Sequence, residues 1–328
     1  MKNKLFILFL FPQLIFSQES DAYTVWKEKL VIHSGISYRT APFSIKYNLP
    51  NDINRLKYKG NLNTIFNVGF AYKWAALKVG LQLPGYLRNK DNFGETRYFD
   101  LNLEFGLKSW YFDFELHTMK GFALVNSTNL DSNLVSEGSA NLLYPSTNSS
   151  SLSLSSWKFF NKEYKVKPAL GIVGRYKKRL LSGYLKTSLN LHGVRNNEAL
   201  MPFTFIDTLN TIARANGLSS LDIGIVPGIA FVDNLKGWQY GAWFGFGGVV
   251  QAKFWSADNS NRGFLGLAPR IDLKLKVGYN VDNYFVMLLA DFDNKSIRFN
   301  DLKYRQIYYQ IGITGGYRFN IKKDNRKK

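Results

Sequence analysis

The stretch "RYFDLNLEFGLKSWYFDFELHTM", residues 97–119, alternates apolar and polar side chains twice. In its first half the odd positions are mostly apolar, and the even positions include Asp100 and Glu104. In its second half the even positions are mostly apolar, and the odd positions include Asp113 and Glu115. A period of two places the apolar residues on one side of an extended chain. The stretch therefore predicts two antiparallel strands, each with an apolar and a polar face, joined at "KSW".

Other segments repeat this pattern over about ten residues, the length that a tilted strand needs to cross a bilayer. One of them is "IDLKLKVGY", residues 271–279, in which apolar and charged residues alternate. Aromatic residues make up 16% of the chain and its 27 glycines are dispersed, while the mean hydropathy is only −0.19. We therefore expect an all-β protein, a transmembrane antiparallel β-barrel of about twelve strands. A soluble β-sandwich is the alternative fold.

The short and long connections between the segments support this topology. Short connections follow the even-numbered strands and longer ones the odd-numbered strands, as expected for a barrel with both termini in the periplasm. The segment "SLSLSSWKFF", residues 151–160, would break this order. With the Ser/Asn-rich run before it we therefore assign it to a long outer loop over 120–163, or to a strand extension above the membrane. The expected strands are 29–39, 62–73, 76–84, 97–107, 109–119, 164–176, 181–193, 217–232, 238–252, 264–279, 284–293 and 304–319.

The first residues have the layout of a cleaved secretory signal peptide over 1–17. Lys2 and Lys4 precede an apolar run of about twelve residues, which is too short for a membrane-spanning helix and ends before the small residue Ser17. The rest, 18–328, reads as one barrel domain of the bacterial outer membrane, with N- and C-termini in the periplasm. Its last strand, "YYQIGITGGYRF", closes the barrel, and the basic residues of 320–328 form a short periplasmic tail.

The formal charge of +19 does not predict a nucleic-acid partner, because the Lys and Arg residues are scattered singly through apolar alternations. The chain contains no cysteine, which excludes disulfides and cysteine chemistry. The partners that we expect are outer-membrane lipid and lipopolysaccharide, whose anionic groups suit a basic surface, and the barrel-assembly machinery during biogenesis. The sequence names no other protein partner.

Strand parity turns most of the charged residues toward the barrel interior. There they form either a network of ion pairs that fills the lumen or the lining of a narrow pore. The interior network is the simpler interpretation, and the selective pore is its main alternative. The expected lumen residues are Arg39, Lys78, Asp100, Glu104, Asp113, Glu115, Lys167, Arg175, Lys186, Asp272, Lys274, Lys276 and Arg318.

We predict no catalytic residue, no cofactor and no metal site. Asp113 and Glu115 are spaced as a general acid/base pair could be, but as polar members of an alternating strand they are lumen residues first. His117 and His192 are expected near the outer rim, where Ser188 shares a face with His192. Two strand spacings amount to roughly 10 Å, so we expect no serine–histidine pair within hydrogen-bond reach. The motifs HExxH and GxSxG are absent.

Several stretches resemble a family of Bacteroidota proteins catalogued as domain of unknown function 4421 (DUF4421) and described as outer-membrane β-barrels. The resemblance lies in "VKPALGIVGRYKKRLLSGYLKTSLN", "LDIGIVPGIAFV", "VGYNVDNYF" and the closing "GGYRF", over roughly residues 60–319. It implies a fold and a location and no activity. We therefore expect a structural, channel or assembly-partner role. The alternatives are an outer-leaflet lipid or lipopolysaccharide hydrolase of the twelve-stranded type and a surface binding protein that uses the loop 120–163.

Overall fold

The computed structural model describes residues 22–47, 55–61, 64–107, 110–130, 132–135, 140–203, 210–257 and 260–321. The predicted signal peptide and most of the predicted basic tail lie outside the described residues. No helix in the described part of the chain is long and apolar enough to span a membrane.

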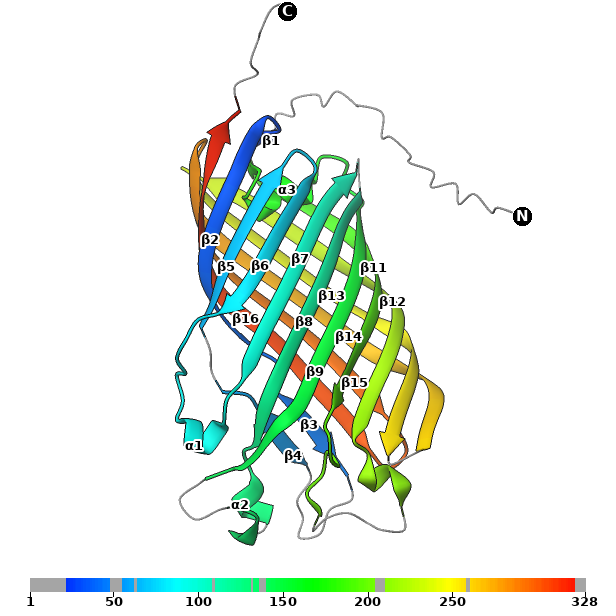
Figure 1. Ribbon diagram of the computed structural model, residues 1–328. Coiled ribbons are helices and arrows are strands. Elements are labelled where there is room, and N and C mark those ends of the chain that lie inside the picture. Colours follow the sequence, from blue (N-terminus) through cyan, green and yellow to red (C-terminus); the bar gives the residue numbers. More distant parts are fainter. Residues whose placement is uncertain are drawn as a thin grey trace, which may run out of the picture.

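Twelve long strands form a closed antiparallel ring (Figure 1). They are β2 (Lys29–Thr40), β5 (Thr64–Tyr72), β6 (Ala75–Gln82), β7 (Arg97–Leu107), β8 (Trp110–Leu124), β9 (Leu142–Phe159), β11 (Leu180–Arg195), β12 (Gly217–Leu235), β13 (Trp238–Ala257), β14 (Ser260–Asn280), β15 (Tyr284–Arg298) and β16 (Lys303–Asn320). Each pairs with its neighbours in this order, and β16 closes the ring on β2, with Tyr309 opposite Thr40 and Asn320 opposite Lys29. Where the strands are paired, closure leaves no free edge that would expose unpaired backbone groups to lipid, but β14 and β15 separate toward the loop end.

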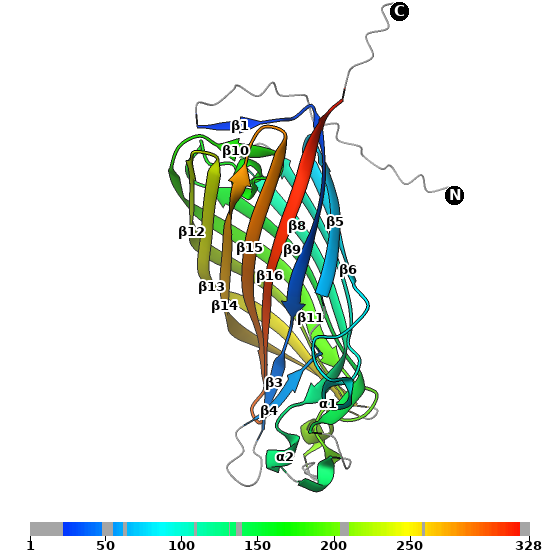
Figure 2. The ribbon, with the colours of Figure 1, turned by 90° about the vertical axis from the view of Figure 1, so that its left-hand side faces the viewer.

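Shorter strands and helices lie at the two ends of the barrel. They are β1 (Tyr23–Val25), β3 (Phe43–Lys46), β4 (Leu56–Lys59), α1 (Lys90–Phe93), α2 (Ser127–Leu130), η1 (Ser132–Leu134), α3 (Val166–Leu170), β10 (Gly174–Tyr176) and η3 (Thr211–Arg214). We call the end with β1, α3 and β10 the terminal end, because the described chain begins and finishes there. The opposite end, with β3, β4, α1 and α2, is the loop end (Figures 1 and 2).

Tight turns join strands at the terminal end. The β12–β13 hairpin has only two turn residues, Lys236 and Gly237, and both have positive φ values, of 50° and 89°. The β5–β6 turn is equally short, and its first residue, Lys73, has a φ of 51°. Two-residue hairpins require this left-handed backbone because its twist matches that of the strands.

Eleven of the twelve predicted strands are confirmed, with ends that differ by a few residues. The strand predicted over 164–176 is wrong, and so is the outer loop predicted over 120–163, because Leu142–Phe159 is the sixth strand, β9. Pro168 is tolerated in the first turn of a helix and Gly171, with a φ of 76°, ends one, so that region forms α3 and then β10. The serine-rich composition of β9 is that of a loop, but its alternation with leucine is that of a strand.

The two faces of the barrel wall differ as the sequence predicts. Outward positions carry exposed apolar side chains, such as Ile36 on β2 and Ile223 on β12. Exposed Trp and Tyr side chains cluster toward the terminal end of the strands, as in the aromatic girdle of a transmembrane barrel. These aromatic residues are Trp74, Trp110, Trp238, Tyr240, Tyr284 and Tyr317.

Candidate functional site

The barrel interior is the most polar part of the molecule. Besides Arg318, ten of the charged residues predicted for the lumen lie on the inner face of the wall. They are Arg39, Lys78, Asp100, Glu104, Asp113, Glu115, Lys186, Asp272, Lys274 and Lys276. Their inward position follows from the period-two pattern of their strands. Whether they line a conducting path stays a prediction.

Ion pairs connect opposite walls of the lumen. The Lys274 ammonium on β14 lies 3.8 Å from a carboxylate oxygen of Asp113 and 3.8 Å from one of Glu115, both on β8. Lys186 on β11 pairs with Asp272 on β14 at 2.8 Å. The two acids of β8 thus face one base from the far side of the ring, which offsets part of the cost of burying these charges.

His117 belongs to a second polar cluster. Arg39 and Asp100 form a buried ion pair at 2.5 Å, and an Arg39 guanidinium nitrogen lies 3.4 Å from the Tyr98 hydroxyl. That hydroxyl is 2.6 Å from the Tyr308 hydroxyl and 3.4 Å from Nδ1 of His117. His117 therefore packs inside the barrel against Tyr308 and does not face an open rim.

His192 belongs to a third cluster, centred on the buried carboxylate of Asp222. His192 Nε2 lies 3.0 Å from Asp222, Arg270 lies 2.7 Å from it, and Gln251 donates to it at 2.9 Å. Ser220 also bonds to Asp222. In the described residues no serine hydroxyl bonds to His117 or His192, and no group of three His, Asp or Glu side chains could hold a metal ion.

A segment over 160–179, between β9 and β11, closes the terminal end of the lumen. We call it the cap. Five of its backbone carbonyls accept hydrogen bonds from wall side chains: Gln239 donates to Pro168 and Ala169, Arg318 to Gly171 and Ile172, and Asn280 to Gly174. Helix ends leave carbonyls without partners, and the wall supplies donors for these. Tyr164 and Ala169 of the cap pack beneath Trp243.

Arg318 connects the cap to the β14–β15 turn. It also bonds to the carbonyls of Val281 and Tyr284, and its guanidinium lies between the Trp26 and Phe285 rings, 4.1 and 4.8 Å from their centres. Arg318 points inward, and its hydrogen bonds are divided between the cap and the β14–β15 turn region. The side chain is only 1% exposed.

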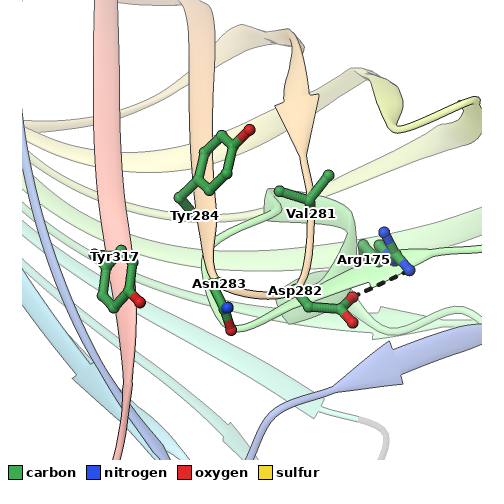
Figure 3. Close-up of a pocket in the computed structure, with 6 residues that line it drawn as sticks. All are labelled: Arg175, Val281, Asp282, Asn283, Tyr284 and Tyr317. Carbon is green, nitrogen blue, oxygen red and sulfur yellow. Dashed lines mark ion pairs between the residues drawn. The ribbon is translucent and has the colours of Figure 1, made fainter.

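The predicted lumen positions of Lys167 and Arg175 are wrong, because both belong to the cap. Lys167, on α3, reaches the carbonyl of Lys73 in the β5–β6 turn. Arg175, on β10, pairs with Asp282 at 3.1 Å in the β14–β15 turn. Figure 3 shows this pair beside a shallow open pocket of about 570 Å³, lined also by Tyr284 and Tyr317. Its cation is already neutralised by Asp282, so the pocket offers a ligand little net charge.

An aromatic cluster closes the loop end. The β3–β4 hairpin continues β2, pairs with β16 on one side and with β8 on the other, and so narrows the ring. Phe43 and Tyr58 of the hairpin stack at 4.5 Å, and Phe122 of β8 meets Phe43 at 5.0 Å. Tyr58 donates to the carbonyl of Leu200, which ties the β11–β12 connection to the cluster. Composition did not reveal this hairpin, because 40–61 reads as a loop.

Between the two closures lies a polar cavity of about 130 Å³. Its lining includes Lys78, Glu104, Lys276 and Asp291, and the interior serines Ser153 and Ser155. A space of this size and polarity holds several water molecules and no large solute.

Nearly the whole chain matches one protein family. The family model described as Domain of unknown function (DUF4421) matches residues 23–319. The protein belongs to the DUF4421 family. The predicted resemblance is confirmed, and the DUF4421 barrel described above spans nearly all of the matched region. No curated protein matches the sequence.

Solved structures with a similar arrangement are distant from this DUF4421 chain. The outer membrane protease OmpT from Escherichia coli is 8% identical, with 90% of this chain and 98% of that chain covered and a TM-score of 0.40. An outer membrane channel from Pseudomonas putida F1 is 7% identical, with 93% and 100% covered and a TM-score of 0.36. The translocator domain of the autotransporter NalP from Neisseria meningitidis is 8% identical, with 89% and 88% covered and a TM-score of 0.36.

Proposed function

We propose that this protein is a closed barrel of the bacterial outer membrane with a structural or assembly-partner role, not a constitutively open channel. The observation that carries the proposal is that the chain itself occupies both mouths: the cap at one end and the aromatic cluster at the other. Each closure is bonded to the wall, so neither is a loose loop. A rigid barrel with two ordered ends offers fixed surfaces to partner proteins.

The proposed location in the outer membrane is based on the polarity of the two faces of the barrel wall. A closed antiparallel ring with an apolar outer belt and a polar interior is stable in lipid, and single-chain bacterial barrels of this kind reside in the outer membrane. The terminal end would then face the periplasm, because all of its connections except the cap are turns of two or three residues, and lipopolysaccharide would surround the loop end. Folding would proceed through the barrel-assembly machinery. This orientation also places both termini in the periplasm.

Single-channel recording in a planar bilayer tests the proposal. The refolded protein, verified by heat-modifiable migration, should give no steady conductance, and Lys186→Ala should be equally silent because its lumen is still sealed at both ends. Steady, salt-dependent openings of the native chain that Lys186→Ala alters would overturn the proposal and make the protein a pore.

The two other predicted roles have less support. A hydrolase that uses a Ser–His pair requires the serine and the histidine to meet. In the described residues His192 bonds to Asp222 and His117 contacts Glu115 and Tyr98 instead. A binding role for the whole of 120–163 is inconsistent with β9, which forms part of the wall.

A further inference from the structure

The wall of the barrel splits between β14 and β15. The two strands pair from Asn280–Phe285 only as far as Asp272–Asp293. Toward the loop end β14 stays paired with β13 up to Ser260, and β15 stays paired with β16 up to Arg298, but not with each other. Pro269 lies in the unpaired part of β14, where its missing N–H costs no ladder bond.

Side chains bridge the split on the side of β15. The Asn294 side chain accepts from the backbone N–H of Ile271 at 2.6 Å, and Arg270 donates to the Asn294 carbonyl at 2.7 Å. Further along, Gln251 donates to the Ser296 carbonyl at 2.9 Å and Lys253 donates to the Arg298 carbonyl. The carbonyls of β15 are therefore satisfied, while no strand of the described chain pairs with this edge of β14.

The free part of β14 carries unusually exposed apolar side chains. Leu265 is 79% exposed and Leu267 is 81% exposed, more than any other large apolar side chain on the described strands. Leu265 lies in register with Ala252 of β13, which in turn lies opposite Leu221 of β12. The leucines thus continue the lipid-facing belt of the neighbouring strands.

Positive charge lies in the same opening. The Lys253 ammonium is 5.4 Å from the centre of the Phe299 ring, and Phe299 meets Phe264 of β14 at 5.7 Å. Arg298, at the end of β15, is exposed. Among the residues that the structure describes, no carboxylate lies within ion-pair distance of Lys253 or Arg298.

We propose that this opening, the β14–β15 notch formed by Lys253, Phe264, Leu265, Leu267 and Arg298, binds a phosphorylated lipid of the surrounding leaflet. Acyl chains would lie along the two leucines on the outer face, and head-group phosphate would meet Arg298 and reach through the split to Lys253, whose cross-strand partner is Phe264 on the inner face. An added strand fits less well, since between two antiparallel neighbours it would run parallel to one of them and would displace the side chains that cap β15. The inference rests on the proposed outer-membrane location, in which lipid A is the phosphorylated lipid at this end.

Native mass spectrometry of the detergent-solubilised full chain tests the site. The probes are bisphosphorylated lipid A and the same lipid without its phosphates. We expect at least tenfold tighter retention of the phosphorylated form. Lys253→Gln with Arg298→Gln should abolish that preference, and Leu265→Ser with Leu267→Ser should weaken retention of both forms. Lipid retention is measured without conductance, so this experiment tests the notch separately from the proposal that the barrel is a closed structural protein.

Matched variants separate the notch from general surface effects. Lys57→Gln with Lys59→Gln removes two exposed loop-end cations from β4, and Ile311→Ser with Ile313→Ser removes two exposed apolar residues from β16. Neither pair should change retention. The lipid site would be overturned if the control variants lost as much lipid as the notch variants, or if both lipids were retained equally. Displacement of the bound lipid by millimolar inorganic phosphate alone would also overturn it. Because the chain has no cysteine, Leu265→Cys reports directly on a second copy, and a disulfide-linked dimer would assign the notch to self-association instead.

Discussion

The two mouths of this barrel are closed by different chemistry. At the loop end, side chains from the β3–β4 hairpin, β8, β16 and the β11–β12 connection bury one another in a cluster of aromatic and aliphatic residues. At the terminal end, the cap packs on aromatic side chains too, but its backbone carbonyls are held by three wall side chains, Gln239, Asn280 and Arg318. The stability of the apolar closure comes from many contacts, whereas that of the polar closure depends on a few hydrogen-bonding side chains. The terminal closure is therefore the one that a single substitution can release.

Arg318→Ala should give the largest effect. It leaves four backbone carbonyls and the Asn280 side chain without this donor, so we expect a loss of about 4 kcal/mol in the free energy of unfolding. The released cap should also allow brief conductance events. Urea unfolding in detergent and bilayer recording measure the two effects. A silent, fully stable variant would show that the cap is held by packing alone.

Phe122→Ala should separate stability from sealing at the other mouth. Truncating this buried ring, which is 1% exposed, should cost about 3 kcal/mol through lost contacts and a cavity. Neighbouring aromatic residues still fill the loop end, so the bilayer should stay silent. Conductance from Phe122→Ala comparable to that from Arg318→Ala would remove the distinction between the two closures.

Lys167 makes the terminal closure sensitive to pH. Burial against the wall lowers the pKa of this cap lysine to about 8, with Glu104 opposing the shift. The unfolded state therefore binds the proton more tightly, and stability rises as pH increases from about 8 toward the unfolded value near 10.5. Relative to Lys167→Met, the native chain should gain on the order of 2 kcal/mol between pH 7 and 10.5. Parallel unfolding curves at every pH would contradict this.

Arg175→Ala should have the smallest effect. Its side chain is 29% exposed and that of its partner Asp282 is 64% exposed, so the pair contributes less than about 1 kcal/mol. The cap should remain docked, since Gln239 and Arg318 are unaffected. A destabilisation equal to that of Arg318→Ala would place the anchor of the cap in the β14–β15 turn instead.

Local sequence pattern predicted most of the wall and much of the lumen. Alternation in 97–119 gave strands β7 and β8 and turned Asp113 and Glu115 inward, because the period of a strand is a property of the backbone. It failed at β9, where Ser149 and Ser151 face a polar interior that only the closed ring creates. It also failed at α3, where apolar residues with strand-like spacing contain Pro168 and Gly171.

The sequence by itself therefore determined eleven of the wall strands and their apolar outer face, since both follow from residue type at every second position. Tertiary structure decided which residues meet: Lys274 with Asp113 across the lumen, Arg318 with the cap, and the β3–β4 hairpin with β8. The separation of β14 from β15 also became visible only in the closed barrel, because a strand carries no mark of where its neighbour stops pairing. Contacts between residues far apart in the chain depend on register and closure, which local periodicity does not encode.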